Sequence, residues 1–183
     1  PTILLLLVLV IFGQDCFGQA PPTPLYAGRK YGSNLYTIDT TGGGFLVTGS
    51  IPMSSGYGPV YDVHGLALNP LTDELYVLYE SAGAYSSNRR LGIVDPMSGA
   101  ITDIGGTGYY HSDIEFGPDG RLYATSTSWS PGTYQLRELD PVTGASSFLM
   151  NYASSSNESG ICYNPFADEL IKISGYALSS INI

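Results

Sequence analysis

Two stretches decide the fold, LGIVDPMSG at residues 91–99 and LRELDPVTG at residues 136–144. A third stretch, LYTIDTTGG at residues 35–43, begins in the same way. In the pattern D-P-x-[ST]-G, proline presets a φ near −65°, and glycine supplies the positive φ that ends the turn. The aspartate side chain accepts a backbone N–H from the same turn. Each stretch therefore predicts an apolar strand that reverses into the next strand of a β-hairpin.

A second motif recurs along the same part of the chain. It reads LALNPLTDELYVL at residues 66–78, IEFGPDGRLYATS at 114–126 and ICYNPFADELIKIS at 161–174. Its prolines Pro70, Pro118 and Pro165 recur at intervals of about 47 residues, which is typical of a repeated β unit. A polar turn between two short apolar strands predicts another hairpin. Together the two motifs predict a unit of four antiparallel strands.

These strands contain too many apolar residues for a sheet with one solvent-exposed face, so both faces are expected to be buried. Radial stacking of such sheets buries both faces, and the sequence therefore predicts an all-β fold, a β-propeller of four-stranded antiparallel blades. We expect blade material at about 25–78, 79–126 and 127–174, with the next blade starting at 175–183. About three and a half blades are then present, which indicates an incomplete propeller. An immunoglobulin-like sandwich is the alternative, but it would not repeat its turns at constant spacing.

The combined pattern is [LI]-x-x-[IVL]-D-P-x-[ST]-G followed by [IL]-x-[FLY]-x-P-x-x-x-x-L-Y. It resembles secreted propellers of the NHL and YVTN type, over nearly the whole chain after its first segment. The resemblance implies the propeller fold. It implies no single activity, because such relatives include lyases, lactonases and scaffolds.

The first segment contains the unbroken apolar run ILLLLVLVIF at residues 3–12. This run is too short for a membrane-spanning helix, which needs about 20 residues, and it suits the core of a secretory signal peptide. Cys16 and Gly18 are small residues that allow cleavage before Gln19. We therefore expect a signal peptide at 1–18, truncated at its start, and a partial propeller at 19–183. The protein is expected to be secreted, or periplasmic or on the cell surface in a bacterium, with no membrane span after cleavage.

The charge composition limits the kinds of partner that this protein is expected to bind. The net charge is −9, and only 7 residues are Lys or Arg, scattered along the chain. No basic stripe is present to neutralise a phosphate backbone, so nucleic acid is not expected as a partner. After cleavage only Cys162 remains, and its apolar strand context predicts a buried structural thiol.

Polar residues precede the first strand of each unit when the units are aligned on their prolines. They are Asp62 and His64, then His111 and Asp113, then Asn157 and Glu158. Because innermost strands line the channel of a propeller, these side chains are expected to gather at one mouth. Imidazole and carboxylate groups can bind a divalent metal or act as general acid and base. The catalytic candidates are His64, His111, Asp113 and Glu158, and Asp62 joins them as a candidate metal ligand. The alternative is that the histidines contact blade backbone or channel water.

No known catalytic spacing such as HExxH or GxSxG occurs in the chain. This favours an extracellular binding or scaffold propeller that recognises a protein or glycan through its loop face. The alternative is a propeller hydrolase or lyase with a metal or acid–base site at the channel mouth. Asn157 begins an N-x-[ST] sequon and is a candidate for N-glycosylation.

Overall fold

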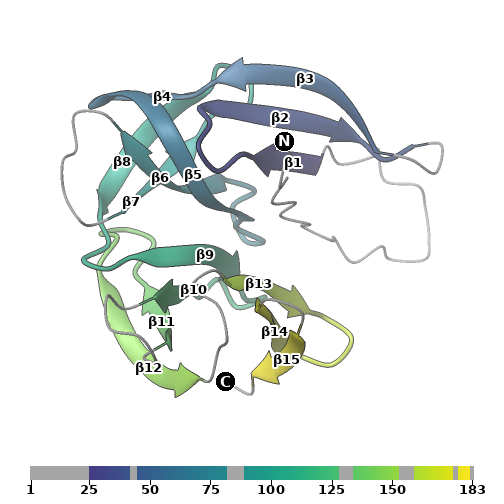
Figure 1. Ribbon diagram of the computed structural model, residues 1–183, viewed down its shortest axis with the longest axis vertical. Helices are drawn as coiled ribbons and strands as arrows, with labels where there is room; N and C mark the ends of the chain where they lie inside the picture. The colour runs from purple at the N-terminus through teal and green to yellow at the C-terminus, as the bar shows by residue number, and fades with distance from the viewer. Residues whose placement is uncertain are drawn as a thin grey trace.

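The computed structural model describes residues 25–41, 45–81, 89–127, 134–152, 159–174 and 177–181. All regular structure in them is β, in four sheets (Figure 1). The first sheet contains β1 (Leu25–Gly28), β2 (Asn34–Asp39) and β3 (Leu46–Pro52). The second contains β4 (Ser54–Ser55), β5 (Gly58–Leu68), β6 (Leu75–Ser81), β7 (Arg90–Val94) and β8 (Ala100–Gly106). The third contains β9 (His111–Phe116), β10 (Leu122–Thr127), β11 (Tyr134–Leu139) and β12 (Ser146–Tyr152). The fourth contains β13 (Ser159–Asn164), β14 (Glu169–Ser174) and β15 (Ala177–Ile181).

Each sheet is an antiparallel meander in which strands adjacent in the sequence pair with one another. The short strand β4 also pairs, antiparallel with β5 and parallel with the start of β8, and so links the first and last strands of the second sheet. Figure 1 shows the four sheets following one another around a common centre. This arrangement is a β-propeller segment in which one sheet of four long strands with the two-residue β4, and one four-stranded sheet, lie between two three-stranded ones, which confirms the predicted fold class.

The blades divide the chain at other points than we expected. The boundary expected after residue 78 falls inside β6, which pairs with both β5 and β7 in one sheet. The boundary expected after residue 126 falls near the end of β10, which likewise pairs with strands on both sides. A repeat establishes its period but not the residue at which the unit begins. In the second, third and fourth sheets the first long strand is the one before the proline motif (β5, β9 and β13), because that strand pairs forward along the chain.

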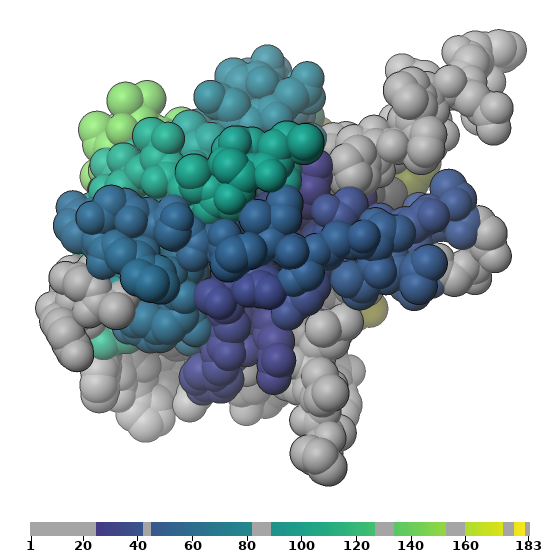
Figure 2. Space-filling model, turned by 90° about the horizontal axis from the view of Figure 1, so that it is seen from above, coloured from purple at the N-terminus to yellow at the C-terminus, as the bar shows by residue number. Residues whose placement is uncertain are grey.

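The hydrophobic core lies between the sheets. One cluster joins Leu35 of the first sheet to Leu66 and Val77 of the second. Another joins Leu78 of the second sheet to Ile114 of the third. Val77 and Leu78 are neighbours in β6, so they point to opposite faces, and both are fully buried. The sheets are therefore apolar on both sides, as the strand patterns indicated. Figure 2 shows the purple and blue segments of the first two sheets in contact on one face of the molecule.

The D-P-x-[ST]-G turns have the geometry that their residue types require. Asp95 accepts the N–H of Met97 at 2.9 Å, and Asp140 accepts that of Val142 at 2.8 Å. Gly99 has a φ of 73° and Gly144 one of 75°. These turns confirm the predicted hairpins. None of the described segments forms a helix of the length and hydropathy that crossing a bilayer requires.

Candidate functional site

The polar residues singled out in the sequence lie on the first strands of two neighbouring blades. Asp62 and His64 are on β5, and His111 and Asp113 are on β9. Strands β5 and β9 are in contact, and β9 also contacts β13. Asn157 and Glu158 lie outside the described residues, and so does the predicted sequon. Four of the six candidates are thus described.

A β-bulge gives the two histidines different surroundings. In β5 the register shifts between Val63 and Gly65, which leaves His64 outside the pairing with β6. In β9 the register shifts between His111 and Asp113. Counted back from Pro70 and Pro118, His64 corresponds to Ser112 rather than to His111. His64 lies at the bulge of its strand, whereas His111 comes one residue before the bulge and pairs with Ser126, so the two histidines do not occupy equivalent sites.

His64 belongs to a polar group that we call the Glu80 cluster, consisting of the buried Asp62 and His64 and the half-buried Glu80 and Arg89. The His64 Nε2 lies 3.0 Å from Glu80 Oε1 and 3.5 Å from Asp62 Oδ2. The Arg89 Nε donates to the same Glu80 oxygen at 3.3 Å. The other Glu80 oxygen accepts the hydroxyl of Tyr61 at 2.9 Å. Both oxygens of Glu80 therefore have donors in the protein.

Glu80 was absent from the sequence prediction, because it lies on β6 and not on a first strand. Strand pairing brings it to the histidine. Among the described residues, one set of side chains has metal-ligand spacing, namely Asp62, His64 and Glu80, whose ligand atoms lie within 4.8 Å of one another. This set includes neither His111 nor Asp113. The structure thus brings together two of the predicted residues, with Glu80 in place of the others.

Hydrogen bonding and burial set the ionisation of the Glu80 cluster. The hydrogen bond with His64 is the main cause that lowers the pKa of Glu80, to about 2. Burial lowers the pKa of His64 below its ordinary value. At neutral pH the cluster therefore holds an ionised Glu80, a neutral His64 and the cation of Arg89. The guanidinium already provides the charge that a metal cation would bring to Glu80.

Asp113 has a structural role. It is buried, its Oδ1 accepts the N–H of Ile114 at 2.9 Å, and its Oδ2 accepts the N–H of Ile161 at 3.0 Å. The second bond crosses from β9 to β13 and joins two blades. Burial raises the pKa of Asp113 to about 7. With both oxygens bound to backbone, this carboxyl group connects first strands instead of facing a ligand.

His111 is fully buried, and among the described residues the Thr107 backbone is the one hydrogen-bonding group near enough to its ring to affect the pKa of the imidazole. Burial and the charges of Arg137 and Arg89 lower its pKa to about 3. Its imidazole is therefore neutral at physiological pH. The ring centroid of Tyr109 lies 6.3 Å from that of His111. Tyr109 is exposed, whereas His111 is buried.

Tyrosine side chains surround these polar groups, and we call Tyr31, Tyr61, Tyr109 and Tyr110 the tyrosine face. Tyr31, Tyr61 and Tyr109 are 77%, 48% and 41% exposed, respectively. The N–H of Tyr31 donates to Asp62 at 2.8 Å, so the β1–β2 turn lies against the Glu80 cluster. The Arg89 guanidinium lies 5.7 Å from the ring centroid of Tyr110. Tyr31, Tyr61 and Tyr110 therefore all contact residues of the Glu80 cluster.

The blades and the tyrosine face define this chain as a segment of a β-propeller with a polar, aromatic loop face. No family model and no curated protein sequence matches it. Among solved structures it is similar to hydrazine synthase of Kuenenia stuttgartiensis, with a TM-score of 0.51 and 17% identity over 87% of this chain. It is also similar to a gluconolactonase of Xanthomonas campestris, with a TM-score of 0.46 and 15% identity over 79% of this chain. A third similar structure is the Dos1 propeller, with a TM-score of 0.46 and 10% identity over 85% of this chain.

The chain spans 42% of the hydrazine synthase chain, 42% of the gluconolactonase and 41% of the Dos1 propeller. At these identities the likeness to hydrazine synthase concerns the fold alone. What this propeller does has to be argued from its own residues.

Proposed function

We propose that this chain is part of an extracellular binding propeller that recognises a protein or glycan through the tyrosine face. The observation that carries the proposal is that the tyrosine face, three of whose side chains are exposed, lies against the half-buried Arg89 and the buried Arg137. Tyrosine and arginine are the residue types enriched at binding hot spots, because they combine apolar area with polar groups. The polar groups beneath fix the ring positions before a ligand arrives, which reduces the entropy cost of binding.

An array of glycans and extracellular protein domains tests this function. The probe is the whole chain, immobilised or fluorescently labelled. We expect binding that falls at least about tenfold in Tyr61→Ala and in Tyr109→Ala, because aromatic hot spots dominate such interfaces. The matched control is Phe166→Ala, which removes a 95% exposed aromatic residue from the β13–β14 turn. Absence of any binding partner, or an equal loss in Phe166→Ala, would contradict the proposal.

The extracellular location is proposed from the first segment of the sequence. An apolar run of signal-peptide length followed by small residues supports export. Expression of the chain behind a complete initiation sequence should release a product whose N-terminus is Gln19, read by mass spectrometry of the medium. Retention of residues 1–18 on an intracellular product would argue against export.

A second candidate function is a propeller hydrolase or lyase that uses the Glu80 cluster. It is favoured by the spacing of Asp62, His64 and Glu80, which suits a divalent cation or an acid–base pair. Elemental analysis of the purified protein, with His64→Ala as the comparison, tests it. Bound metal in near-equal proportion to protein, lost in His64→Ala, would favour this second function. Protein free of metal, with no hydrolysis or elimination of glycan substrates, would exclude it.

A further inference from the structure

Three arginines of this chain share one arrangement, in which the guanidinium lies over a tyrosine ring and pairs with a carboxylate. Arg90 lies 4.3 Å from the ring centroid of Tyr57 and donates to both oxygens of Asp103. Arg121 lies 5.3 Å from that of Tyr123 and donates to both oxygens of Glu138. Arg89 lies over the ring of Tyr110 in the same way, and it donates one hydrogen bond to Glu80.

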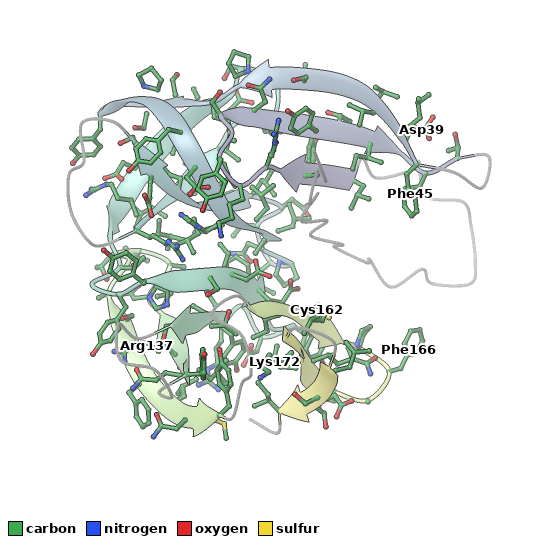
Figure 3. All side chains as sticks on the ribbon, viewed as in Figure 1. Asp39, Phe45, Arg137, Cys162, Phe166 and Lys172 are labelled. Carbon is green, nitrogen blue, oxygen red and sulfur yellow. The ribbon has the colours of Figure 1, made fainter. Side chains whose placement is uncertain are left out.

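Arg137 also lies over a tyrosine ring, but none of its hydrogen-bond partners among the described residues is a carboxylate. Its guanidinium lies 3.7 Å from the ring centroid of Tyr109, and the residue is only 6% exposed. Figure 3 labels Arg137 in the third sheet. Among the residues that the structure describes, its hydrogen-bond partners are neutral, namely the side chain of Gln135 and the hydroxyl and carbonyl oxygens of Ser146. A buried guanidinium without a counter-charge is costly, because the loss of hydration is not offset by an ion pair.

The strand register explains why the carboxylate is missing. Arg137 on β11 pairs with Phe148 on β12. The corresponding pair in the preceding blade is Gly92 with Asp103. Phe148 thus occupies the position from which Asp103 neutralises Arg90 in that blade. Within the described part of the chain, no carboxylate is supplied at this point of the third blade.

The donors left on Arg137 suit a carboxylate. A guanidinium has five N–H groups, and the three hydrogen bonds of Arg137 use one on each nitrogen. One N–H therefore remains on each terminal nitrogen, which is the number that a bidentate carboxylate requires.

His111 is an independent sign of a ligand at the same place. It is completely buried, and among the described residues only the Thr107 backbone is near enough to hydrogen-bond its ring. Arg137 is close enough for its charge to lower the pKa of the imidazole. Buried polar groups with incomplete hydrogen bonding are rare in folded proteins, and each needs an explanation. A neutral imidazole has one N–H, so a carboxylate that binds Arg137 accepts from His111 when the ring donates to it in place of the Thr107 carbonyl.

We propose that Arg137, His111 and Tyr109 bind the carboxylate of an acidic sugar, a uronate, at the tyrosine face. This inference rests on the proposed binding function and specifies its ligand. The rings of Tyr109 and Tyr110, which are neighbours in the sequence, provide flat surfaces for a sugar ring. An acidic polypeptide is disfavoured, because an aspartate or glutamate side chain has no flat ring to lie against these tyrosines.

The ligand reaches Arg137 when the Tyr109 side chain moves aside. Tyr109 is 41% exposed, and its carbonyl accepts the hydroxyl of Thr107 at 3.1 Å. Gly108, between them, has a positive φ of 74° and open space around it. The backbone at Gly108 therefore has room for this movement, and the contact of the Tyr109 ring with Arg137 is what the ligand has to replace.

Calorimetric titration of the whole chain with oligoglucuronate and oligogalacturonate tests the inference. Neutral glucose oligomers and an aspartate-rich peptide serve as comparison probes. We expect uronate affinity to fall at least about tenfold in Arg137→Lys, because lysine keeps the charge but lacks the paired N–H groups that bind both oxygens of a carboxylate. The matched control is Arg121→Lys, whose guanidinium already has Glu138. This control should bind the uronate as the unmodified chain does.

Phe148→Asp is a second variant that does not depend on how well Arg137→Lys folds. Phe148 is 51% exposed, so the site accepts a polar side chain, and paired residues of neighbouring strands lie on one face. The new carboxylate should pair with Arg137 and compete with the ligand. We expect uronate binding to be lost while the melting temperature stays the same or rises.

Two results would overturn the inference. One is equal affinity for uronate and neutral oligomers, and the other is undiminished uronate binding in Arg137→Lys and Phe148→Asp. Binding of the aspartate-rich peptide alone, lost in Arg137→Lys, would overturn the assignment to sugars. Loss of uronate binding in Tyr61→Ala with retention in both variants would leave the proposed function standing and refute this inference. Failure of every array probe to bind would refute the proposed function itself.

Discussion

Asp113 shows how one residue connects three blades. Counted back from the prolines, Gly65, Asp113 and Gly160 occupy the same position in successive units. A Cβ on Gly65 would lie 2.7 Å from Asp113 Oδ1, whereas a Cβ on Gly160 would lie 3.5 Å from Asp113 Oδ2. The glycines leave room for the carboxyl group between the first strands. The carboxyl group in turn provides an acceptor for the Ile161 N–H of the next blade.

The raised pKa of Asp113 makes stability depend on pH. Its pKa is about 7 in the folded protein, against about 3.9 in an unfolded chain. Because the folded state binds the proton more tightly, this group stabilises the fold fully below pH 4, and the contribution is lost as pH rises to about 7. Asp113→Asn should therefore destabilise the protein most at pH 4. The difference from the unmodified protein should shrink by about 1.4 kcal/mol per pH unit towards pH 7.

Urea unfolding at a series of pH values measures this difference. The control is Asp119→Asn, in the exposed turn at the far end of the same strand. We expect it to leave the pH profile unchanged. A destabilisation by Asp113→Asn that grows with pH would show that the carboxylate is the favoured folded form.

At the scale of elements, the D-P-x-[ST]-G turns connect blades as well as strands. A Cβ on Gly99 would collide with the carbonyl of Pro52 at the end of β3. A Cβ on Gly144 would lie 3.1 Å from the carbonyl of Gly105 near the end of β8. In both cases the turn of one blade packs on the last strand of the preceding blade. The glycine is needed for its positive φ and for this close approach.

Alanine at these two turns should be costly to different extents. Gly99→Ala and Gly144→Ala each impose a positive φ on a residue with a Cβ, at about 1–2 kcal/mol. Gly99→Ala should cost more, because its Cβ also meets backbone that cannot move easily. Gly56→Ala is the control, since nothing lies within 4 Å of that Cβ and its φ is not positive. Equal melting temperatures for all three variants would refute the role of the turns in blade packing.

The outcome for the candidate site shows what strand patterns predict and what they miss. The proline motifs brought Asp62 and His64 together, but they placed both residues ahead of the first strand, whereas both lie within β5. They did not reveal Glu80, which reaches His64 only because β6 pairs with β5. They also grouped His64 with His111, although the residue aligned with His64 is Ser112 and both of these lie at the bulge of their strand.

At the scale of the whole molecule, each blade contacts its neighbours in the chain, so stability depends on nearest-neighbour interfaces. The second and third blades have a neighbour on both sides, and their strands β6 and β10 are almost entirely buried. The outer strands of the first and fourth sheets are more open, with Leu46 65% and Leu178 73% exposed.

We therefore expect hydrogen exchange to be graded along the chain. Amides of β6 and β10 should exchange at least about tenfold more slowly than those of β3 and β15, because end blades open before central ones. Mass spectrometry of peptic peptides measures these rates. A single rate for all four sheets would show that the segment unfolds as one unit.

The sequence by itself determined the period, the two hairpin types and the apolar character of both sheet faces, because turns and strand patterns are local properties of the chain. Only the tertiary structure decided where each blade begins, that Asp113 links blades and that Arg137 has no carboxylate opposite it. These facts depend on strand register and on which side chains meet across blades. Register follows from pairing between segments distant in sequence, and a single bulge changes it without leaving a mark in the repeat.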